Sequence, residues 1–225
     1  MLQTVLIFVL LIVALGAVIG IVGLIWYGKY LRRQMWMRLA DKYQMRYSRT
    51  DPFDIPQSFE FALLREGRSR QAFNCLDGTY KGLPVILFDY RFVTGLGNQS
   101  KSHELSALLT RLSIACNHLI IRPETAMGRF AAFLGFGAIQ FEFEEFNRTY
   151  NVHCEDKKFA YDICHPDMME FMLEYPTLTW ELQGNHLLLY CPEIEFDPEC
   201  VARCLEVACG FSKRIPRYMQ VEERA

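Results

Sequence analysis

The sequence of 225 residues lacks the short motifs that mark common catalytic and metal sites. It contains no Cys-x-x-Cys pair, so a zinc ribbon or a thioredoxin-type redox site has no support. It also lacks Gly-x-Ser-x-Gly, Ser-x-x-Lys and His-Glu-x-x-His, the segments that identify many hydrolases and zinc proteases. No internal repeat is present. The informative features are therefore the placement of charge and of apolar residues.

Charge is missing from the start of the chain. Met1–Gly28 contains no Asp, Glu, Lys or Arg, and Val5–Tyr27 consists almost wholly of aliphatic residues, glycine and phenylalanine. About 20 helical residues cross a hydrocarbon core of roughly 30 Å, so this stretch is long enough to span a membrane. A cleaved signal peptide fits poorly, because neither a basic n-region nor an Ala-x-Ala site is present. The sequence predicts a transmembrane helix over residues 1–28.

Basic residues follow the apolar run and predict its orientation. Residues 1–50 carry seven Lys/Arg and one Asp, whereas residues 51–225 carry 17 Lys/Arg and 25 Asp/Glu. The positive-inside rule then predicts a single-pass protein with its N-terminus outside and residues 29–225 in the cytoplasm. The predicted membrane-interface residues are Trp26, Tyr27, Lys29, Arg32 and Arg33.

The distribution of charge also indicates which binding partners to expect. A basic helix beside an acidic domain argues against a nucleic acid, so the expected partners are the lipid bilayer and a protein. Arg38, Lys42, Arg46 and Arg49 recur with helical spacing and either touch anionic headgroups or form a solvated face. Gly16 and Gly20 match the small-xxx-small pattern of helix dimers, but the ordinary glycine content of a membrane helix is the favoured explanation.

The chain divides into four predicted parts. The transmembrane helix over residues 1–28 continues as a basic juxtamembrane helical stalk over residues 29–50, with helical pattern to about Tyr47. Pro52 and Pro56 break this pattern. An α+β cytoplasmic domain is expected over residues 51–218, followed by a tail over 219–225. Because the strand and helix signals lie beyond the prolines, the sequence predicts that residues 51–225 fold without the anchor.

Short apolar runs separated by turn residues predict an antiparallel sheet with helices grouped late in the chain and a C-terminal helix. Asp77-Gly78 and Lys81-Gly82 indicate a turn, Gly184-Asn185 indicates a hairpin, and Asp156 and Asp197-Pro198 indicate helix starts. The expected strands cover residues 59–64, 70–76, 83–92, 102–115, 118–122, 139–143, 150–154, 178–182 and 186–190. The spacing of leucines in residues 102–115 also fits a helix, but a strand is favoured because the strand expected over 118–122 follows closely. The expected helices cover residues 125–134, 156–163, 167–175 and 197–209.

The segment around Phe146 is predicted to form part of the core. If a strand begins near Phe146, then Phe146, Tyr150 and Val152 share one face, and Thr149 and Asn151 point outward. The eight cysteines are expected to be reduced and mostly buried, because a domain of this size needs no disulfides. Cys200 and Cys204 share a helix face, for which small core residues are a better explanation than a metal.

Clustered carboxylates offer an alternative site of low specificity. Paired carboxylates with a histidine serve acid–base chemistry or hold a cation, but a solvated sheet face is the simpler interpretation. Arg122 and Arg148 are expected to pair with Asp89, Glu124 or Glu145. The residues of this alternative site are Glu142, Glu144, His153, Asp156 and His165.

The order of several motifs resembles a known family. Gly78 and Gly82 precede Leu87-Phe-Asp-Tyr90, and Arg122-Pro-Glu124 precedes Glu142–Val152 and Asp156. Over about residues 1–218, the chain resembles an uncharacterised family of bacterial single-span membrane proteins with a cytoplasmic domain of unknown function. The resemblance implies an inner-membrane location and this architecture only; it supplies no cofactor and no catalytic residue.

Two functions from different classes remain at this point. One is a membrane-tethered binding or scaffold module, and the other is a membrane-anchored hydrolase or metal-dependent enzyme that uses the alternative site. The missing catalytic motifs favour the module.

Overall fold

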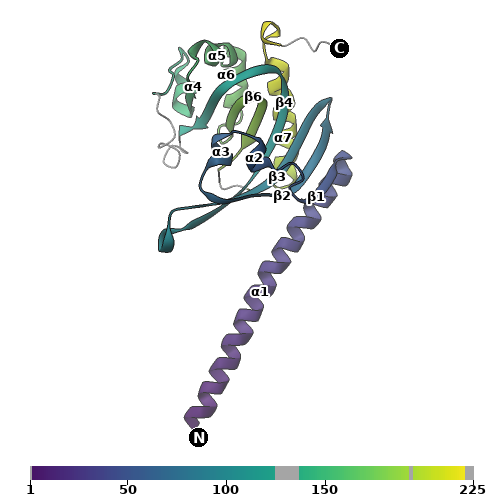
Figure 1. Cartoon of the computed structure of the whole chain (residues 1–225), viewed down its shortest axis with the longest axis vertical. Coiled ribbons are helices and arrows are strands. Elements are labelled where there is room, and N and C mark those ends of the chain that lie inside the picture. Colours follow the sequence, from purple (N-terminus) through teal and green to yellow (C-terminus); the bar gives the residue numbers. More distant parts are fainter. Residues whose placement is uncertain (1, 125–136, 193–194, 221–225) are drawn as a thin grey trace.

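The computed structural model describes residues 2–124, 137–192 and 195–220, with side chains from residue 10 onward. The fold is α+β, as predicted: one long N-terminal helix, an antiparallel sheet and a C-terminal helix. The long helix, α1 (Leu2–Tyr43), projects from the domain, which lies at its C-terminal end (Figure 1). The predicted helix over 125–134 lies outside the described residues.

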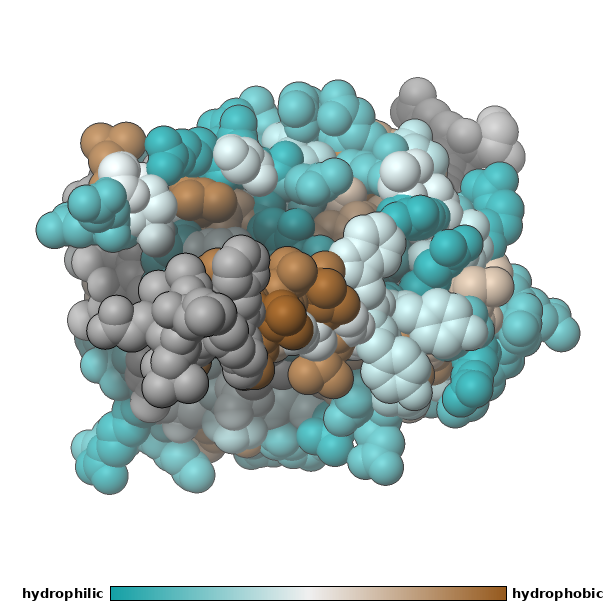
Figure 2. All heavy atoms as spheres, turned by 90° about the horizontal axis from the view of Figure 1, so that it is seen from below, coloured by the Kyte–Doolittle hydropathy of each residue, from teal (hydrophilic) through white to brown (hydrophobic). Residues whose placement is uncertain are grey.

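Helix α1 has two environments along its length. It has 42 residues, and its described part has the length and apolar composition of a membrane-spanning helix. Apolar side chains from Leu10 to Leu31 are exposed, whereas Trp36, Leu39 and Ala40 are buried in the domain core. Viewed along α1 from its N-terminal end, hydrophobic atoms stand out against a mostly hydrophilic domain surface (Figure 2). The helix therefore has an exposed apolar part and a packed part.

The prediction that the helix continues to about Tyr47 is wrong. Helix α1 ends at Tyr43, Gln44 adopts a left-handed conformation with φ 54°, and strand β1 (Arg46–Thr50) follows. Arg46 and Arg49 therefore lie on a strand and cannot continue a helical stripe with Arg38. Since β1 pairs with the next strand and Met45 is buried, residues of the predicted stalk pack with the domain.

The sheet has six strands in the order β1-β2-β3-β4-β5, with β6 paired to β4. Its remaining strands are β2 (Arg68–Tyr80), β3 (Leu83–Thr94), β4 (Lys101–Pro123), β5 (Tyr150–Cys154) and β6 (Thr179–Tyr190). Residues 107–110 of β4 lie between β3 and β6, and residues 119–121 lie between β5 and β6. Strand β4 therefore connects the two halves of the sheet.

Several strand predictions need correction at their ends. The two strands expected over 102–115 and 118–122 are one strand, β4, and the hairpin expected over 178–190 is one strand, β6. Gly184, with φ 64°, lies where the β4–β6 register shifts beside Cys116, so it allows an irregularity and not a turn. The turn between β2 and β3 uses Lys81 and Gly82, while Asp77 and Gly78 lie within β2.

The helices differ from the predictions in a similar way. Residues 59–64 form no strand, because short helices α2 (Ile55–Ser58) and α3 (Ala62–Arg65) occupy this region. In the expected strand 139–143, Ile139 forms an isolated bridge. The other helices are α4 (Glu144–Thr149), α5 (Lys157–Ile163), α6 (Pro166–Leu173) and α7 (Pro198–Arg214), with 3-10 turns η1 (Gly97–Gln99) and η4 (Arg217–Met219).

The predicted helix starts at Asp156 and Asp197 are confirmed. The Asp156 carboxylate accepts from Phe159 N, and Asp197 accepts from Cys200 N. Helix α7 does not stop at Gly210, because its backbone stays helical to Arg214. A Cβ at Gly210 would lie 2.6 Å from the Phe171 ring, so glycine here allows α6 and α7 to approach closely. The first tail residues contact the sheet through a bridge between Gln220 and Ile114.

Both faces of the sheet are covered. On one face the end of α1 packs with α4–α7 on side chains such as Leu87, Leu108 and Trp180. On the other face α2 and α3 cover side chains such as Phe88 and Tyr90. All eight cysteines are free, and all except Cys200 are buried.

The prediction that Phe146 belongs to the core is confirmed, but the prediction that a strand begins there is wrong. Phe146, Tyr150 and Val152 are each at most 2% exposed, but Phe146 lies in α4 and only the other two lie in β5. The Asn147 side chain accepts from Phe141 N at 3.0 Å and donates to Phe141 O at 2.7 Å. This amide therefore holds the loop that precedes α4.

Candidate functional site

A buried carboxylate joins α1 to the sheet. Asp89, on β3, is 3% exposed and faces the same side of the sheet as Leu87. The Arg32 guanidinium, on α1, donates from Nη2 to Asp89 Oδ1 at 2.5 Å and from Nε to Oδ2 at 3.1 Å. The Arg32 side chain is only 17% exposed, so both charges are largely withdrawn from water. Two-point contacts between arginine and carboxylate are directional as well as strong.

Three further donors complete the bonding of Asp89. Trp36 Nε1 donates at 2.9 Å and Asn74 Nδ2 at 2.8 Å to Oδ2, and Ser106 Oγ donates at 2.6 Å to Oδ1. A carboxylate offers about four lone-pair sites, and five hydrogen bonds already occupy them. Asp89 therefore has no remaining capacity for a metal or a substrate.

Local structure explains why these groups meet. Arg32 and Trp36 lie one turn apart on α1, and Asp89 and Ser106 are directly paired on neighbouring strands. Asn74 lies at a register shift of β2 with φ 51°, a left-handed conformation that asparagine tolerates. Its Oδ1 accepts from Tyr47 Oη at 2.8 Å, which orients the amide toward Asp89.

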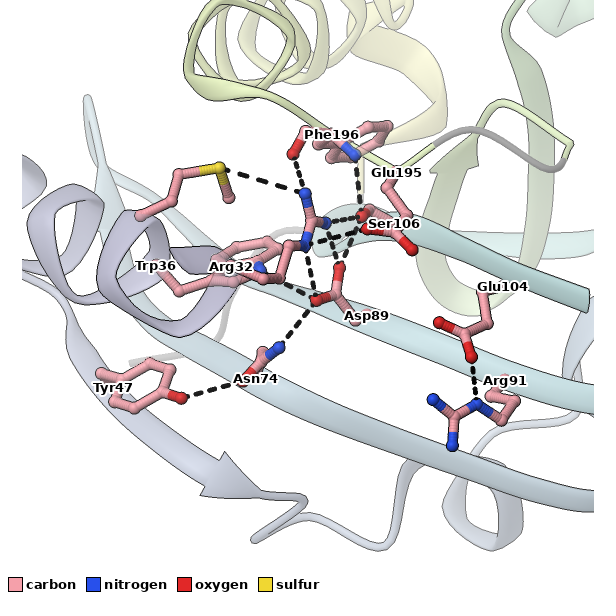
Figure 3. Close-up of polar contacts among 11 residues, drawn as sticks. Arg32, Trp36, Tyr47, Asn74, Asp89, Arg91, Glu104, Ser106, Glu195 and Phe196 are labelled. Atoms are coloured by element: carbon pink, nitrogen blue, oxygen red, sulfur yellow. Dashed lines mark hydrogen bonds and ion pairs between the residues drawn. The ribbon is translucent and has the colours of Figure 1, made fainter. Parts of the chain in front are cut away.

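Arg32 also binds the segment before α7. Its Nη1 donates to Phe196 O at 2.5 Å, and its Nε lies 3.2 Å from Glu195 Oε2. Phe196 N in turn donates to Ser106 Oγ at 2.9 Å. We call Arg32, Trp36, Asn74, Asp89 and Ser106, with the Phe196 backbone, the Arg32 junction (Figure 3). One guanidinium thus connects α1, two strands and the start of α7.

The electrostatics of the junction favour a structural role over a catalytic one. Burial raises the pKa of Glu195 above its usual range, with a smaller opposing effect of Arg32 and reinforcement by Asp89 and Glu104. Arg32 and Asp89 form a largely buried ion pair. Removing one partner of a buried ion pair leaves the other charge without its main countercharge, which costs about 3–5 kcal/mol. The junction therefore acts as a structural clamp between the membrane helix and the domain.

The predicted membrane-interface residues now separate into two groups. Trp26 is 71% and Tyr27 59% exposed, and Lys29 and Arg33 are also exposed, as an interface requires. Arg32 differs, because its guanidinium is directed into the domain and not toward the surroundings of α1. The structure therefore gives Arg32 a role in the junction, and its place at the membrane interface stays a prediction.

The alternative carboxylate–histidine site is not assembled. Glu142 is exposed, Glu144 pairs with Arg148, Asp156 caps α5 and accepts from Asn117, and His165 caps α6. His153, on β5, is half-buried. Within residues 2–124, 137–192 and 195–220, no three His, Cys, Asp or Glu side chains gather in a way that suits a metal ion. The expected pairing of Arg148 with Asp89, Glu124 or Glu145 is wrong, since Arg148 binds Glu144.

A second buried carboxylate carries no signal in the sequence pattern. Glu181, on β6, is fully buried, and its Oε1 accepts from Ala62 N and lies 2.8 Å from His118 Nε2. This contact ties α3 to the opposite face of the sheet from α1. Arg122 and Glu66 are buried as well. Asp89, one of the partners expected for Arg122, is instead bound by Arg32.

Comparison with known proteins shows the fold but no family. No family model and no curated protein sequence matches the chain. Among solved structures, the chain is similar to the mycobacterial trehalose monomycolate transport factor A, TtfA, with a TM-score of 0.58 and 14% sequence identity. The similarity covers 85% of this chain and 98% of the TtfA chain. At this identity the match establishes a shared fold.

Proposed function

We propose that this protein is a membrane-tethered, non-catalytic accessory module in membrane transport, with residues 29–225 in the cytoplasm beside a bacterial inner membrane. Its acidic domain would bind a protein partner at the membrane surface. The observation that carries the proposal is the Arg32 junction, which fixes the domain on α1 through charged groups that have no free bonding capacity.

The position of the clamp along α1 supports this function. Arg32 lies three residues after Lys29, the first charged residue, which corresponds to about 4.5 Å of helix rise. No flexible segment separates the apolar helix from the domain, because α1 is continuous to Tyr43. A domain mounted so closely is suited to holding a partner at a set distance from the bilayer.

The fold shared with TtfA supports an accessory role over catalysis, since that protein is described as a transport factor. The alternative of a hydrolase or metal-dependent enzyme gains no observation from the carboxylates and histidines predicted for it. A homodimer through Gly16 and Gly20 remains a prediction. A Cβ at either position would meet nothing in the described part of the chain, which leaves that helix face open.

Orientation is tested with reporters fused after Ala225. A reporter that is active only in the cytoplasm should be active, and one that requires export should not. The reverse result would overturn the cytoplasmic location of the domain.

The transport role is tested by deletion and complementation. Cells that lack the protein should show an altered distribution of one envelope lipid class, measured by mass spectrometry of fractionated membranes, and the wild-type chain should restore it. A chain with a short Gly-Ser linker inserted after Lys29 keeps the junction but frees the domain from the membrane helix, and it should fail to complement. The same linker inserted in the exposed loop after Gly95 is the control. Unchanged lipids in the deletion strain would refute the transport role, and full complementation by the Lys29 insertion would refute rigid mounting.

A further inference from the structure

A groove runs beside the packed part of α1. One wall is the face of α1 between Tyr30 and Lys42, and Pro198, at the start of α7, contributes the domain side. Its volume is about 390 Å³. Sites for small molecules commonly measure about 300–1,000 Å³, so the groove has the size of a ligand site. Asp89 and the bonds of the Arg32 junction are not part of its lining.

The groove changes polarity along the helix. Tyr30, Leu31 and Met35 line the end nearest the exposed apolar part of α1, and Arg38 and Lys42 line the far end. Leu31 and Arg38 are seven residues apart, which corresponds to about 10 Å of helix rise. The groove is thus apolar toward the proposed bilayer and cationic away from it.

The cations of the groove are available to a ligand. Arg32 and Arg46 are both paired with aspartates. Arg38, in contrast, is exposed and has no hydrogen bond or ion pair with any residue in the described ranges. Lys42 places its ammonium 5.1 Å from the centre of the Tyr43 ring and is otherwise exposed. The nearby acidic residues Asp41 and Glu199 are exposed and do not line the groove.

We propose that this groove binds an anionic phospholipid from the same bilayer, with its phosphate at Arg38 and Lys42. The first acyl carbons and the glycerol would contact Leu31 and Met35. An amphiphile matches both ends of the groove, whereas free phosphate would leave the apolar wall in water. Surface cations attract anionic lipids, and the groove adds shape to that attraction. The inference rests on the membrane location of α1 in the proposed function.

The experiment uses the full chain in nanodiscs of phosphatidylcholine that contain a minor fraction of phosphatidylglycerol. After transfer to detergent, native mass spectrometry counts the phosphatidylglycerol molecules that remain bound. Arg38→Gln and Lys42→Gln should each lower the retained phosphatidylglycerol about fivefold, the factor for a charge worth about 1 kcal/mol. Gln34→Trp should also lower it, because the larger side chain fills the groove without changing its charge.

Two matched controls separate the groove from diffuse surface attraction. Arg49→Gln removes an exposed cation of β1 that does not line the groove, and Lys158→Gln removes an exposed cation of α5 at the opposite end of the domain (Figure 1). Both variants should retain phosphatidylglycerol like wild type. Near-UV circular dichroism confirms that each variant is folded before lipid is counted.

Three results would overturn the proposal. Equal losses for Arg49→Gln and Arg38→Gln would indicate a diffuse charge effect, and full retention by Gln34→Trp would exclude the groove. Binding of inorganic phosphate to the lipid-free protein in detergent, with the same dependence on Arg38, would exclude a lipid as the specific ligand. A chain that fails to enter nanodiscs contradicts the proposed function itself, whereas a chain that enters and retains no lipid contradicts only the groove.

Discussion

Asp89→Ala tests the clamp most directly. The substitution removes the acceptor of five hydrogen bonds and the main countercharge of Arg32, while Glu195, with a side chain 44% exposed, remains as a weaker partner. Breaking a buried pair in this way costs about 3–5 kcal/mol. For a protein of this size each kcal/mol lowers the Tm by about 2–4 °C, so the expected loss is roughly 6–20 °C.

Unfolding of the full chain in detergent, followed by tryptophan fluorescence, measures this loss. Trp36 and Trp180 are fully buried and report on the side of the sheet that the junction occupies. Asp77→Ala is the matched control, because it breaks an exposed pair with Arg46 and should change the Tm little. In a double-mutant cycle, Arg32→Ala and Asp89→Ala should be strongly non-additive. Equal Tm values for Asp89→Ala and Asp77→Ala would refute the reasoning.

Phe146→Ala should cost about 3–5 kcal/mol in chemical denaturation because a fully buried ring is lost, whereas Tyr161→Ala, which removes a half-exposed ring, should cost clearly less; similar losses would contradict the core assignment. A fragment of residues 29–225 should unfold cooperatively. A fragment of residues 51–225 should not, because it lacks Trp36 and strand β1, which pack with the rest of the domain. Cooperative unfolding of the shorter fragment would support a domain boundary after residue 50. Cys200 should be alkylated before the other cysteines near neutral pH, because a hydrogen bond from Cys204 lowers the pKa of Cys200 and raises its thiolate fraction. Burial raises the pKa of Cys116 to about 12, so Cys116 should react slowly. Peptide mass spectrometry measures both rates, and faster labelling of Cys116 would contradict this order.

The sequence predicts local features of the fold well where the signal is itself local. The apolar run of α1 and the capping residues Asp156 and Asp197 act within a few residues of the chain. Gly184-Asn185 also carries a local turn signal, but pairing along β4 outweighs it and keeps β6 extended. The pattern predicts burial of Phe146 correctly even though it predicts a strand there, because positions 146 and 150 share a face in a helix and in a strand alike.

The sequence does not predict the Arg32 junction, because its residues are far apart along the chain. Arg32 and Asp89 lie 57 residues apart, and neither belongs to a recognisable motif. A lone arginine next to an apolar run looks like an ordinary interface residue, and its burial depends on how β3, β4 and the segment before α7 assemble. The i, i+4 spacing of Arg32 and Trp36 was the only local sign of a packed helix face.

The continuity of α1 has a mechanical consequence. Transmembrane helices adapt to bilayer thickness by tilting, and sharp bends that absorb such a change usually occur at a proline, a Gly/Ser pair or a π-bulge. Residues 2–43 contain no proline, and the far end of the helix is fixed to the sheet by Asp89. When the membrane-embedded part of α1 changes its tilt, the sheet therefore rotates with it by a similar angle. The orientation of the domain, and of any surface it presents, thus depends on the thickness of the membrane around it.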